Sequence, residues 1–387
     1  MPEKSSTSRC PLCFLNRSRP LPLAPAGESE AAVEVEPTSS NESLGDKPPP
    51  PPSPCEPLGT TDLATSGSER AARWVTPYDA ILKATDNLSD ARVIGHGGFG
   101  TVYGGELPDG RRAAFKRLRP GSHRFVCKSQ FVAEMDAIVK VEHPNLVPLL
   151  GYSALRDEHF LISEHMRHGS LESWLRNQQA RTSRRAIGWR HRLGICLGAA
   201  CGLAFLHHGL ALHAVHGDVK SSNVLLDEGM APRVSGFGLA RIIRGYDTHV
   251  RTSVVAGGAL GYVPPGYPLA MKCTAKGDVY GFGVVVLEVL TGRPPAGQEV
   301  EEGGGDLVGW VRWMVAHGRE GELFDPCLPA SGLGREQMAR ALAVARECTA
   351  DEPWKRPTMG SVVKDLEMVQ LMEHGGPHGL QGREVPA

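Results

Sequence analysis

A glycine-rich run near residue 95 has the residue types needed to hold a phosphate chain. The run is Gly95-His96-Gly97-Gly98-Phe99-Gly100-Thr101-Val102, which fits the pattern G-x-G-x-x-G-x-V. Glycines let two strands fold over phosphates with backbone N–H groups exposed, because no side chain blocks the approach. Such hairpins are common, so this run by itself is weak evidence and needs support from other residues.

The residues after the run separate two kinds of nucleotide fold. A dinucleotide-binding fold places its glycine run between a strand and a helix. Here Val102 and Tyr103 follow, and both are typical of strands. The sequence therefore favours a nucleotide held under a β-hairpin, with Gly95, Gly97, Gly100 and Val102 in contact with it.

A lysine and a glutamate follow in an order that suits phosphate binding. Lys116 ends the strand-like run that contains Ala114, sixteen residues after Gly100. Glu134 is on the next amphipathic segment, where it can pair with that lysine. Isolated charges are usually solvated. Their order after the glycine run predicts that Ala114 and Lys116 line the nucleotide site, with Glu134 holding the lysine.

A second motif carries a resemblance to a known family. It reads His216-Gly217-Asp218-Val219-Lys220-Ser221-Ser222-Asn223 and fits H-R-D-x-K-x-x-N. Further along the chain stand Gly236-Phe237-Gly238 at the Asp-Phe-Gly position, Lys276-Gly277-Asp278, and Arg356-Pro357. With this spacing, the chain resembles a protein kinase from about residue 92 to 368.

The resemblance implies a role for each motif residue. Asp218 would accept the proton of a substrate hydroxyl, Lys220 would steady the transferring phosphoryl group, and Asn223 would bind one Mg²⁺. Glu164 and Met166 would lie in the hinge that reads adenine. Asp278 would bond the backbone of the catalytic loop. The implied cofactors are ATP and Mg²⁺.

Several short sequence segments resemble those of plant leucine-rich-repeat receptor kinases in particular. They are His143-Pro144-Asn145-Leu146-Val147, Gly169-Ser170-Leu171, Leu206-His207-His208-Gly209 and Asp325-Pro326-Cys327-Leu328. Two more, Asp306-Leu307-Val308-Gly309-Trp310 and Ala350-Asp351-Glu352-Pro353-Trp354, are similar to the multiple-sporocyte type of grasses. The resemblance covers only the intracellular kinase part of such receptors.

One position departs from the kinase pattern at the metal site. Gly236 stands where the family has the aspartate that binds Mg²⁺ between the phosphates. Phosphoryl transfer depends on positioning and on neutralisation of charge by the metal, so this loss removes a main source of rate. The neighbouring Ser235 offers only a hydroxyl, which is a poorer ligand for a hard dication. Mg²⁺ binding is therefore doubtful.

Other departures fall in the same region of the implied fold. Gly217 replaces an arginine that reads phosphate, and Ala259 replaces a threonine of the substrate-docking loop. Gly266 replaces the glutamate expected to pair with Arg356. A buried arginine without its partner is costly, so we expect either that Arg356 reaches solvent or that residues 259 to 267 are loosened.

Hydrophobic periodicity along the chain predicts the helices and strands that would position these residues. Strand-like runs lie around Val93, at 101–104, 112–118, 146–151 and 160–165, and helical patterns at 78–88, 131–139, 193–206, 279–290, 307–315 and 338–345. We predict an α+β protein kinase fold with a small antiparallel-sheet lobe (92–167) and a larger helical lobe (168–368). A juxtamembrane-like helix (71–91) precedes it, and a flexible tail (369–387) follows.

Residues 1–70 have a composition of their own. They are rich in Pro, Ser and Glu, with a proline run at 48–52, and cannot bury enough apolar area to offset the entropy of ordering. We predict a disordered tail. Cys10 and Cys13 have half the spacing of a zinc knuckle, but no second pair lies nearby, so free thiols are favoured.

Charge, cysteine content and hydropathy limit the kinds of partner and the cellular location that the sequence predicts. The net charge of −1 gives no field that favours nucleic acid. Nine scattered cysteines argue against a disulfide framework. No membrane span or signal peptide is expected, since the apolar stretch 193–215 contains histidines and glycines. The expected location is cytoplasmic, at the inner face of the plasma membrane if Cys10 or Cys13 is acylated.

Three functional hypotheses remain open at this point. The first is a pseudokinase that holds a nucleotide and docks other protein kinases or receptor complexes. The second is a slow Ser/Thr kinase that acts on a protein substrate with Asp218, Lys220 and Asn223. The third is an adaptor whose proline-rich tail binds the partner and whose kinase fold is only a mount.

Overall fold

The computed structural model describes residues 75–97, 100–119, 141–155, 158–177, 187–210, 214–236, 241–242, 250–251, 261–264, 272–297, 305–328 and 332–372. The predicted tail at 1–70, the helix at 131–139 with Glu134, and both Ala259 and Gly266 lie outside these residues. Of the predicted tail at 369–387, residues 373–387 also lie outside them, whereas residues 369–371 are the last turn of the final helix.

The N-terminal lobe is built on a five-stranded antiparallel sheet. Its strands are β1 (Val93–Gly97), β2 (Gly100–Glu106), β3 (Arg112–Leu118), β4 (Leu149–Leu155) and β5 (Glu158–Glu164), in the order β1-β2-β3-β5-β4. The strands predicted at 93, 101–104 and 112–118 are confirmed. The strand predicted at 146–151 begins and ends later than expected, because its pairing with β5 runs from Leu149 opposite Ser163 to Leu155 opposite Glu158.

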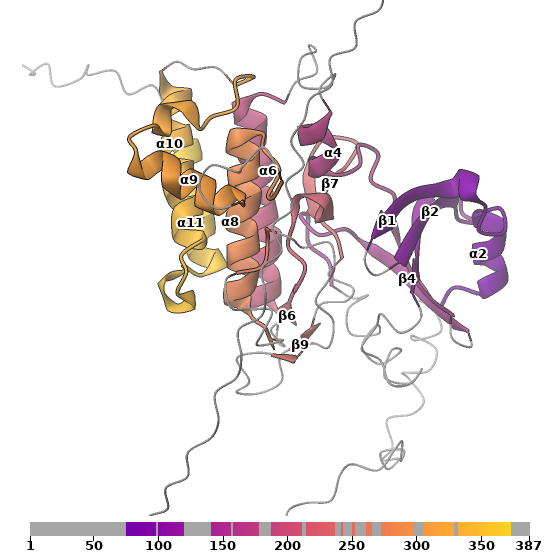
Figure 1. The fold of residues 1–387 in the computed structure, drawn as a ribbon. Helices are drawn as coiled ribbons and strands as arrows, with labels where there is room; N and C mark the ends of the chain where they lie inside the picture. Colours follow the sequence, from indigo (N-terminus) through magenta and orange to yellow (C-terminus); the bar gives the residue numbers. More distant parts are fainter. Residues whose placement is uncertain are drawn as a thin grey trace, which may run out of the picture. The chain divides into compact units, whose positions relative to one another are not determined.

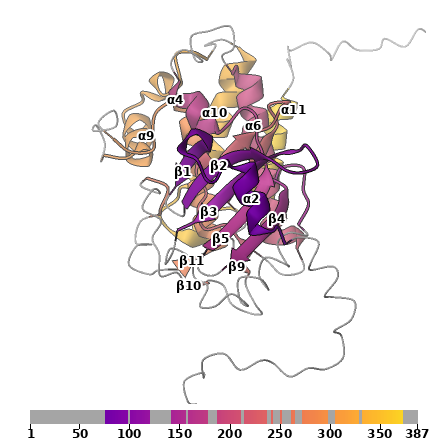
Figure 2. The same ribbon diagram turned by 90° about the vertical axis from the view of Figure 1, so that its right-hand side faces the viewer.

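A short helix covers one face of this sheet. Helix α2 (Tyr78–Ala84) places Ile81 in a small core with Tyr103, Ala113, Phe115 and Phe160. Figure 2 shows α2 over the sheet. Because side chains alternate along β3, Ala114 and Lys116 point to the face opposite Ala113 and Phe115.

The C-terminal lobe is mainly helical, and α8 runs through its core. The helices are α4 (Leu171–Arg176), α6 (Trp189–Ala204), α8 (Ala275–Thr291), α9 (Leu307–Ala316), α10 (Leu333–Cys348) and α11 (Met359–Leu371). Every residue of α8 from Asp278 to Thr291 is buried. Figure 1 shows α6 and α8 side by side, with α10 and α11 packed against them. Thr274 caps the start of α8, and Gly292, with φ of +68°, ends it in the left-handed conformation.

Short strands carry the loops between these helices. The pairs are β6 (Ala214–Val215) with β9 (Arg241–Ile242), β7 (Val224–Leu226) with β8 (Pro232–Val234), and β10 (Val250–Arg251) with β11 (Lys272–Cys273). The loop after β6 leads into the turn Ser221–Asn223 and then into β7. The predicted kinase fold, a sheet lobe followed by a helical lobe, is confirmed.

Candidate functional site

The described glycines of the run lie at the end of β1 and the start of β2, where Gly97 pairs with Gly100. A Cβ atom at Gly100 would lie 1.9 Å from the Arg117 carbonyl oxygen, so packing requires glycine there. A Cβ at Gly95 would meet no atom within 4 Å, and one at Gly97 only the Gly100 oxygen at 3.9 Å. Neither the fold nor packing demands glycine at 95 and 97, so their missing side chains leave room for a ligand.

Three predicted nucleotide contacts share one face of the sheet. Val102 pairs with Lys116 across β2 and β3, and Ala114 is two residues before that lysine. All three are half-buried, on the face opposite α2. Burial lowers the pKa of Lys116, while the charge of Asp218 raises it and that of Lys220 lowers it. Lys116 is thus within electrostatic range of the catalytic loop.

The two hinge residues lie differently from each other. Met166 is buried, whereas the side chain of Glu164 is exposed and lines a surface cavity with Arg111, Arg112 and His165. Glu164 pairs with Ala113, so its side chain is on the α2 face and not on the face of Lys116. Only the backbone of Glu164 is placed to read an adenine.

Asp218, Lys220 and Asn223 form a compact triangle. The Lys220 Nζ lies 2.9 Å from Asp218 Oδ2, and Asn223 Nδ2 donates to the same oxygen at 2.9 Å and to the Asp218 carbonyl at 2.6 Å. The other carboxylate oxygen, Oδ1, is buried and accepts no hydrogen bond from the residues that the structure describes. A buried acceptor of this kind costs free energy unless a donor arrives, so the triangle fits an incoming hydroxyl group.

Gly236 adjoins this triangle. Its φ is +85°, and a Cβ built on it would contact the Asn223 carboxamide at 3.5 to 3.6 Å. That spacing is ordinary van der Waals contact, so a side chain at 236 would have room and would stand beside Asn223. A side chain at 236 would therefore stand where the resemblance implies a second metal ligand, and glycine supplies none.

The catalytic loop rests on a carboxylate of α8. Asp278 Oδ2 accepts from the His216 N–H at 2.7 Å and lies 2.8 Å from His207 Nε2, and Oδ1 accepts from the Gly217 N–H at 2.8 Å. Asp278 and His207 are both buried. The implied role of Asp278 thus has the geometry to support it. His207 is an additional partner, which the sequence analysis named only as part of a family segment and gave no structural role.

A second carboxylate of α8 was missed by sequence reasoning. Glu288 is fully buried; its Oε2 accepts from Tyr262 Oη at 2.5 Å, its Oε1 accepts from Ser221 Oγ at 3.2 Å, and Arg176 pairs with it. Burial raises the pKa of Glu288 to about 7, against the lowering effect of Arg176. Its signal in the sequence is a lone charge inside the apolar run 279–290.

Arg356 is buried with 2% of its surface exposed, so the first of its two expected alternatives, exposure to solvent, is excluded. The second concerns residues 259–267, of which only 261–264 are described. Its guanidinium donates to the carbonyl oxygens of Ala350, Asp351 and Lys276 and lies over the Tyr280 ring, 5.0 Å from the centroid. Hydrogen bonds to these backbone carbonyl oxygens offset the free-energy cost of burying the charged guanidinium.

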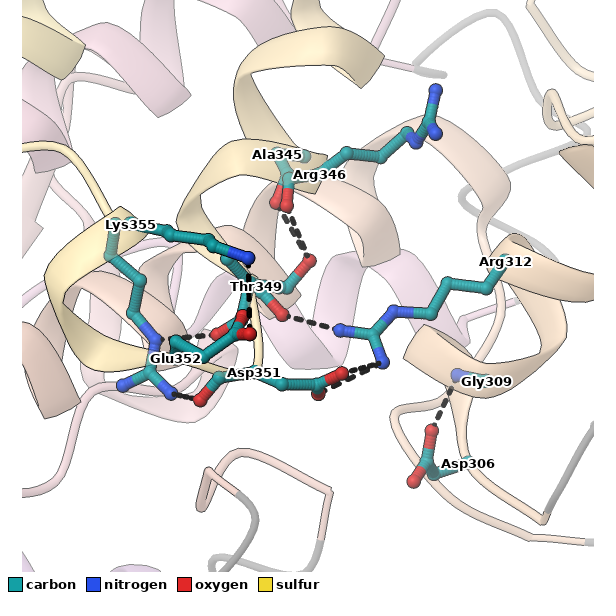
Figure 3. Close-up of polar contacts among 11 residues, drawn as sticks. Asp306, Gly309, Arg312, Ala345, Arg346, Thr349, Asp351, Glu352 and Lys355 are labelled. Atoms are coloured by element: carbon teal, nitrogen blue, oxygen red, sulfur yellow. Dashed lines mark hydrogen bonds and ion pairs between the residues drawn. The ribbon is translucent and has the colours of Figure 1, made fainter.

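Arg312 of α9 fixes the loop that precedes Arg356. It donates to both oxygens of Asp351 at 2.9 and 3.0 Å and to the Thr349 carbonyl at 2.7 Å (Figure 3). The Thr349 hydroxyl in turn donates to Ala345 at the end of α10. This contact is exposed, in contrast to the buried arginine.

The described residues fit the nucleotide better than the metal. The open glycines, Lys116 and the buried Met166 suit a phosphate chain and a base. Within the described part of the chain, no group of three His, Cys, Asp or Glu side chains comes together as a metal site. Asp218 and Asn223 are the oxygen donors near Gly236, which is short of what Mg²⁺ prefers.

Comparisons with known proteins agree with this geometry. The model for protein tyrosine and serine/threonine kinases matches residues 88–366. The chain is 59% identical over 361 residues to the leucine-rich repeat receptor protein kinase MSP1 of Oryza sativa subsp. japonica, covering 93% of this chain and 27% of that protein. It is 44% identical over 290 residues to EMS1 of Arabidopsis thaliana, another leucine-rich repeat receptor protein kinase, covering 75% and 24%.

A solved structure shares the fold as well. The pseudokinase domain of BIR2, an immune regulator of the RLK/Pelle family, superposes with a TM-score of 0.60 at 30% identity, covering 76% of this chain and 87% of that one.

The chain spans about a quarter of the length of these curated receptors. Among the described residues, no helix has the length and apolarity that crossing a membrane requires. The motifs, the two-lobed fold and the matches together confirm the predicted resemblance: the chain belongs to the protein tyrosine and serine/threonine kinase family, with a kinase domain of the plant leucine-rich-repeat receptor type.

Proposed function

We propose that this chain is a nucleotide-binding pseudokinase, which holds ATP and signals by docking other protein kinases or receptor complexes. The observation that carries the proposal is Gly236, which has no side chain beside Asn223 where the family binds Mg²⁺. Protein kinases in general use ATP with Mg²⁺, which neutralises charge on the phosphates. Without this ligand, transfer of the γ-phosphate is slow or absent.

The rest of the site supports retention of the nucleotide. Gly95 and Gly97 leave space above the sheet, and Lys116 lies within range of the catalytic loop. The proposed contacts are those of the sequence prediction, with Glu164 acting through its backbone. The similarity to a domain described as a pseudokinase adds support. The proposed location is cytoplasmic, near receptors at the inner face of the plasma membrane.

A slow Ser/Thr kinase is the second candidate, and the Asp218 triangle favours it. Asp218 Oδ1 is buried and free to accept the proton of a protein hydroxyl, while Lys220 and Asn223 hold the other oxygen in place. This geometry is what a general base needs. The third candidate, an adaptor that binds through its tail, concerns residues outside the described ranges. If residues 1–70 are deleted and partner binding persists, the adaptor hypothesis fails.

Transfer of radiolabelled phosphate from ATP separates the first two candidates. The purified chain is compared with Gly236→Asp, which restores the carboxylate, and with Gly236→Asn, which has the same shape without the charge. A pseudokinase gives background transfer that only Asp raises, by at least about tenfold, equivalent to 1.4 kcal/mol of barrier. Robust transfer by the unmodified chain that Asp218→Asn abolishes establishes the slow kinase and contradicts the proposal.

A further inference from the structure

Helix α2 lies over the sheet (Figure 2) and contacts it closely at both ends. At its start, the Tyr78 hydroxyl donates to Glu158 Oε2 at 3.2 Å, and the Tyr78 ring meets the Phe160 ring edge-on with centroids 5.9 Å apart. At its end, a Cβ atom on Gly105 of β2 would lie 2.4 Å from the Ala84 carbonyl oxygen. The position of α2 is therefore fixed by polar and backbone contacts as well as by apolar burial.

Glu158 joins this helix to β3. Its Oε1 pairs with the Arg117 guanidinium, while its Oε2 accepts from Tyr78. The hydrogen bond to Glu158 raises the pKa of Arg117 against the lowering effect of burial, and Tyr103 adds to the rise. The side chains of Arg117 and Glu158 are 41% and 29% exposed, and an isolated pair with this exposure adds little to stability. The pair can nevertheless set the position of β3, because Tyr78 holds the same carboxylate from the other side.

Arg117 adjoins two residues that the proposed function assigns to the nucleotide. Lys116 precedes it in β3, and because successive side chains alternate, Arg117 is on the α2 face while Lys116 is on the opposite face. Gly100 of the glycine run lies against the Arg117 backbone, since a Cβ atom there would be 1.9 Å from the Arg117 carbonyl oxygen. A change in the position of Arg117 would therefore shift both residues.

From these contacts we propose that Glu158 is a positioning residue for the nucleotide site and that, through Glu158 and Arg117, the docking of α2 sets the affinity for ATP. Glu158 is on the α2 face of the sheet, so it acts through Arg117 and not by contact with the nucleotide. The inference rests on the proposed nucleotide binding and goes beyond it by giving the segment before the kinase lobes control over the site. Coupling between two sites is reciprocal, so bound ATP also strengthens the docking of α2.

Calorimetric titration of ATP into the full chain, in MgCl₂ and in EDTA, tests the positioning role with Glu158→Gln. This variant keeps the shape but removes a negative charge, which by itself would tighten the binding of a polyanion. We expect ATP binding to weaken by about fivefold instead, because Arg117 loses its charged partner. Asp109→Asn, which removes one charge from the exposed Asp109–Arg111 pair of the same lobe, is the matched control and should change the affinity by less than about twofold. Thermal unfolding verifies that both variants fold.

Hydrogen exchange of α2 measures the coupling in the other direction. The Thr85 amide donates to the Ile81 carbonyl at the end of the helix, and peptides that cover residues 75–85 report its opening by mass spectrometry. We expect saturating ATP to slow this exchange by about threefold in the unmodified chain and to leave it unchanged in Glu158→Gln. A residue that only stabilised the lobe would change the exchange equally with and without ATP.

The outcomes separate this inference from the proposed function. If Glu158→Gln binds ATP as tightly as the unmodified chain, or more tightly, the positioning role is overturned and nucleotide binding stays intact; equal weakening by Asp109→Asn leads to the same conclusion. Exchange of α2 that ATP does not slow in the unmodified chain overturns the coupling, and this measurement needs no variant. Absence of ATP binding by the unmodified chain in both buffers overturns the inference and the proposed nucleotide binding together.

Discussion

Two regions on either side of the loop 216–223 differ in how many of their polar groups have hydrogen-bond partners. We call the buried carboxylates of α8, Asp278 and Glu288, the frame of this loop, and the side of the loop that carries Asp218 and Gly236 the nucleotide face. Below the loop, Asp278 and Glu288 of α8 each accept from several donors and are buried. Above it, Asp218 Oδ1 accepts from none of the described donors and Gly236 offers no side chain. The comparison teaches that the chain keeps the contacts that position the loop, whereas the change that we propose lies in the groups that would act on a nucleotide.

The largest expected effect comes from breaking the frame at Asp278. In Asp278→Ala, the N–H groups of His216 and Gly217 and the imidazole of His207 lose their acceptor in a buried place. We expect a loss of about 3–5 kcal/mol in the free energy of unfolding, measured with urea. Asp278→Asn keeps the shape and one acceptor and should lose less. A loss below about 1 kcal/mol in the alanine variant would contradict the stabilising role that we assign to Asp278.

The second prediction concerns Glu288 and the dependence of the free energy of unfolding on pH. Its folded pKa of about 7 lies above the ordinary value of 4.5, so the folded state holds the proton longer. Its stabilising contribution is complete below pH 4.5 and is lost as pH rises through 7. From pH 5 to 7.5, stability should fall by about 2 kcal/mol more in the unmodified chain than in Glu288→Gln.

Urea unfolding of both proteins across this range measures the difference, and other titrating groups cancel between them. Parallel curves would show that Glu288 is ionised throughout, with Arg176 outweighing burial.

A smaller effect is expected on the nucleotide face, at Gly236. The φ of +85° disfavours a side chain, while the surrounding atoms leave room for one. Gly236→Ala should cost about 1 kcal/mol of stability, and Gly236→Asn less, because asparagine tolerates the left-handed region. Differential scanning calorimetry compares the two. Equal losses would mean that contact with Asn223, and not backbone strain, sets the cost.

The smallest effect is expected far from both regions, at Arg312. Its Nη1 donates to both oxygens of Asp351 (Figure 3). The two side chains are 43% and 57% exposed. Arg312→Ala should cost less than about 1 kcal/mol, and the cost should shrink in high salt. A loss that stays the same in 1 M salt would indicate that the bond to the Thr349 carbonyl dominates.

Local patterns predicted much of the fold because the relevant forces act over short stretches. The glycine run followed by Val102 predicted a hairpin, and the strand that ends near Lys116 spans 112–118 as expected. Hydrophobic runs placed α8 and α9 within a few residues. The start and end of β4 were misplaced, because hairpin pairing with β5 outweighed local apolar content.

The candidate site was predicted in part. Motif spacing named the Asp218 triangle and the missing carboxylate at 236, and the structure brings Asp218, Lys220 and Asn223 together. Glu288 was overlooked because its partners come from distant segments, 26 and 67 residues away for Tyr262 and Ser221. A single sequence does not show which far segment meets a lone buried charge.

The sequence by itself determined the kinase family, the order of its lobes and the replacement of a metal ligand by Gly236, because these depend on residue types at fixed spacing. Only the tertiary structure decided that Arg356 is buried against carbonyl groups, that Glu164 turns its side chain away from the Lys116 face, and which glycines leave open space. These features depend on which atoms surround a residue in three dimensions. The surrounding atoms belong to segments that are far apart in the sequence, so local sequence patterns do not reveal them.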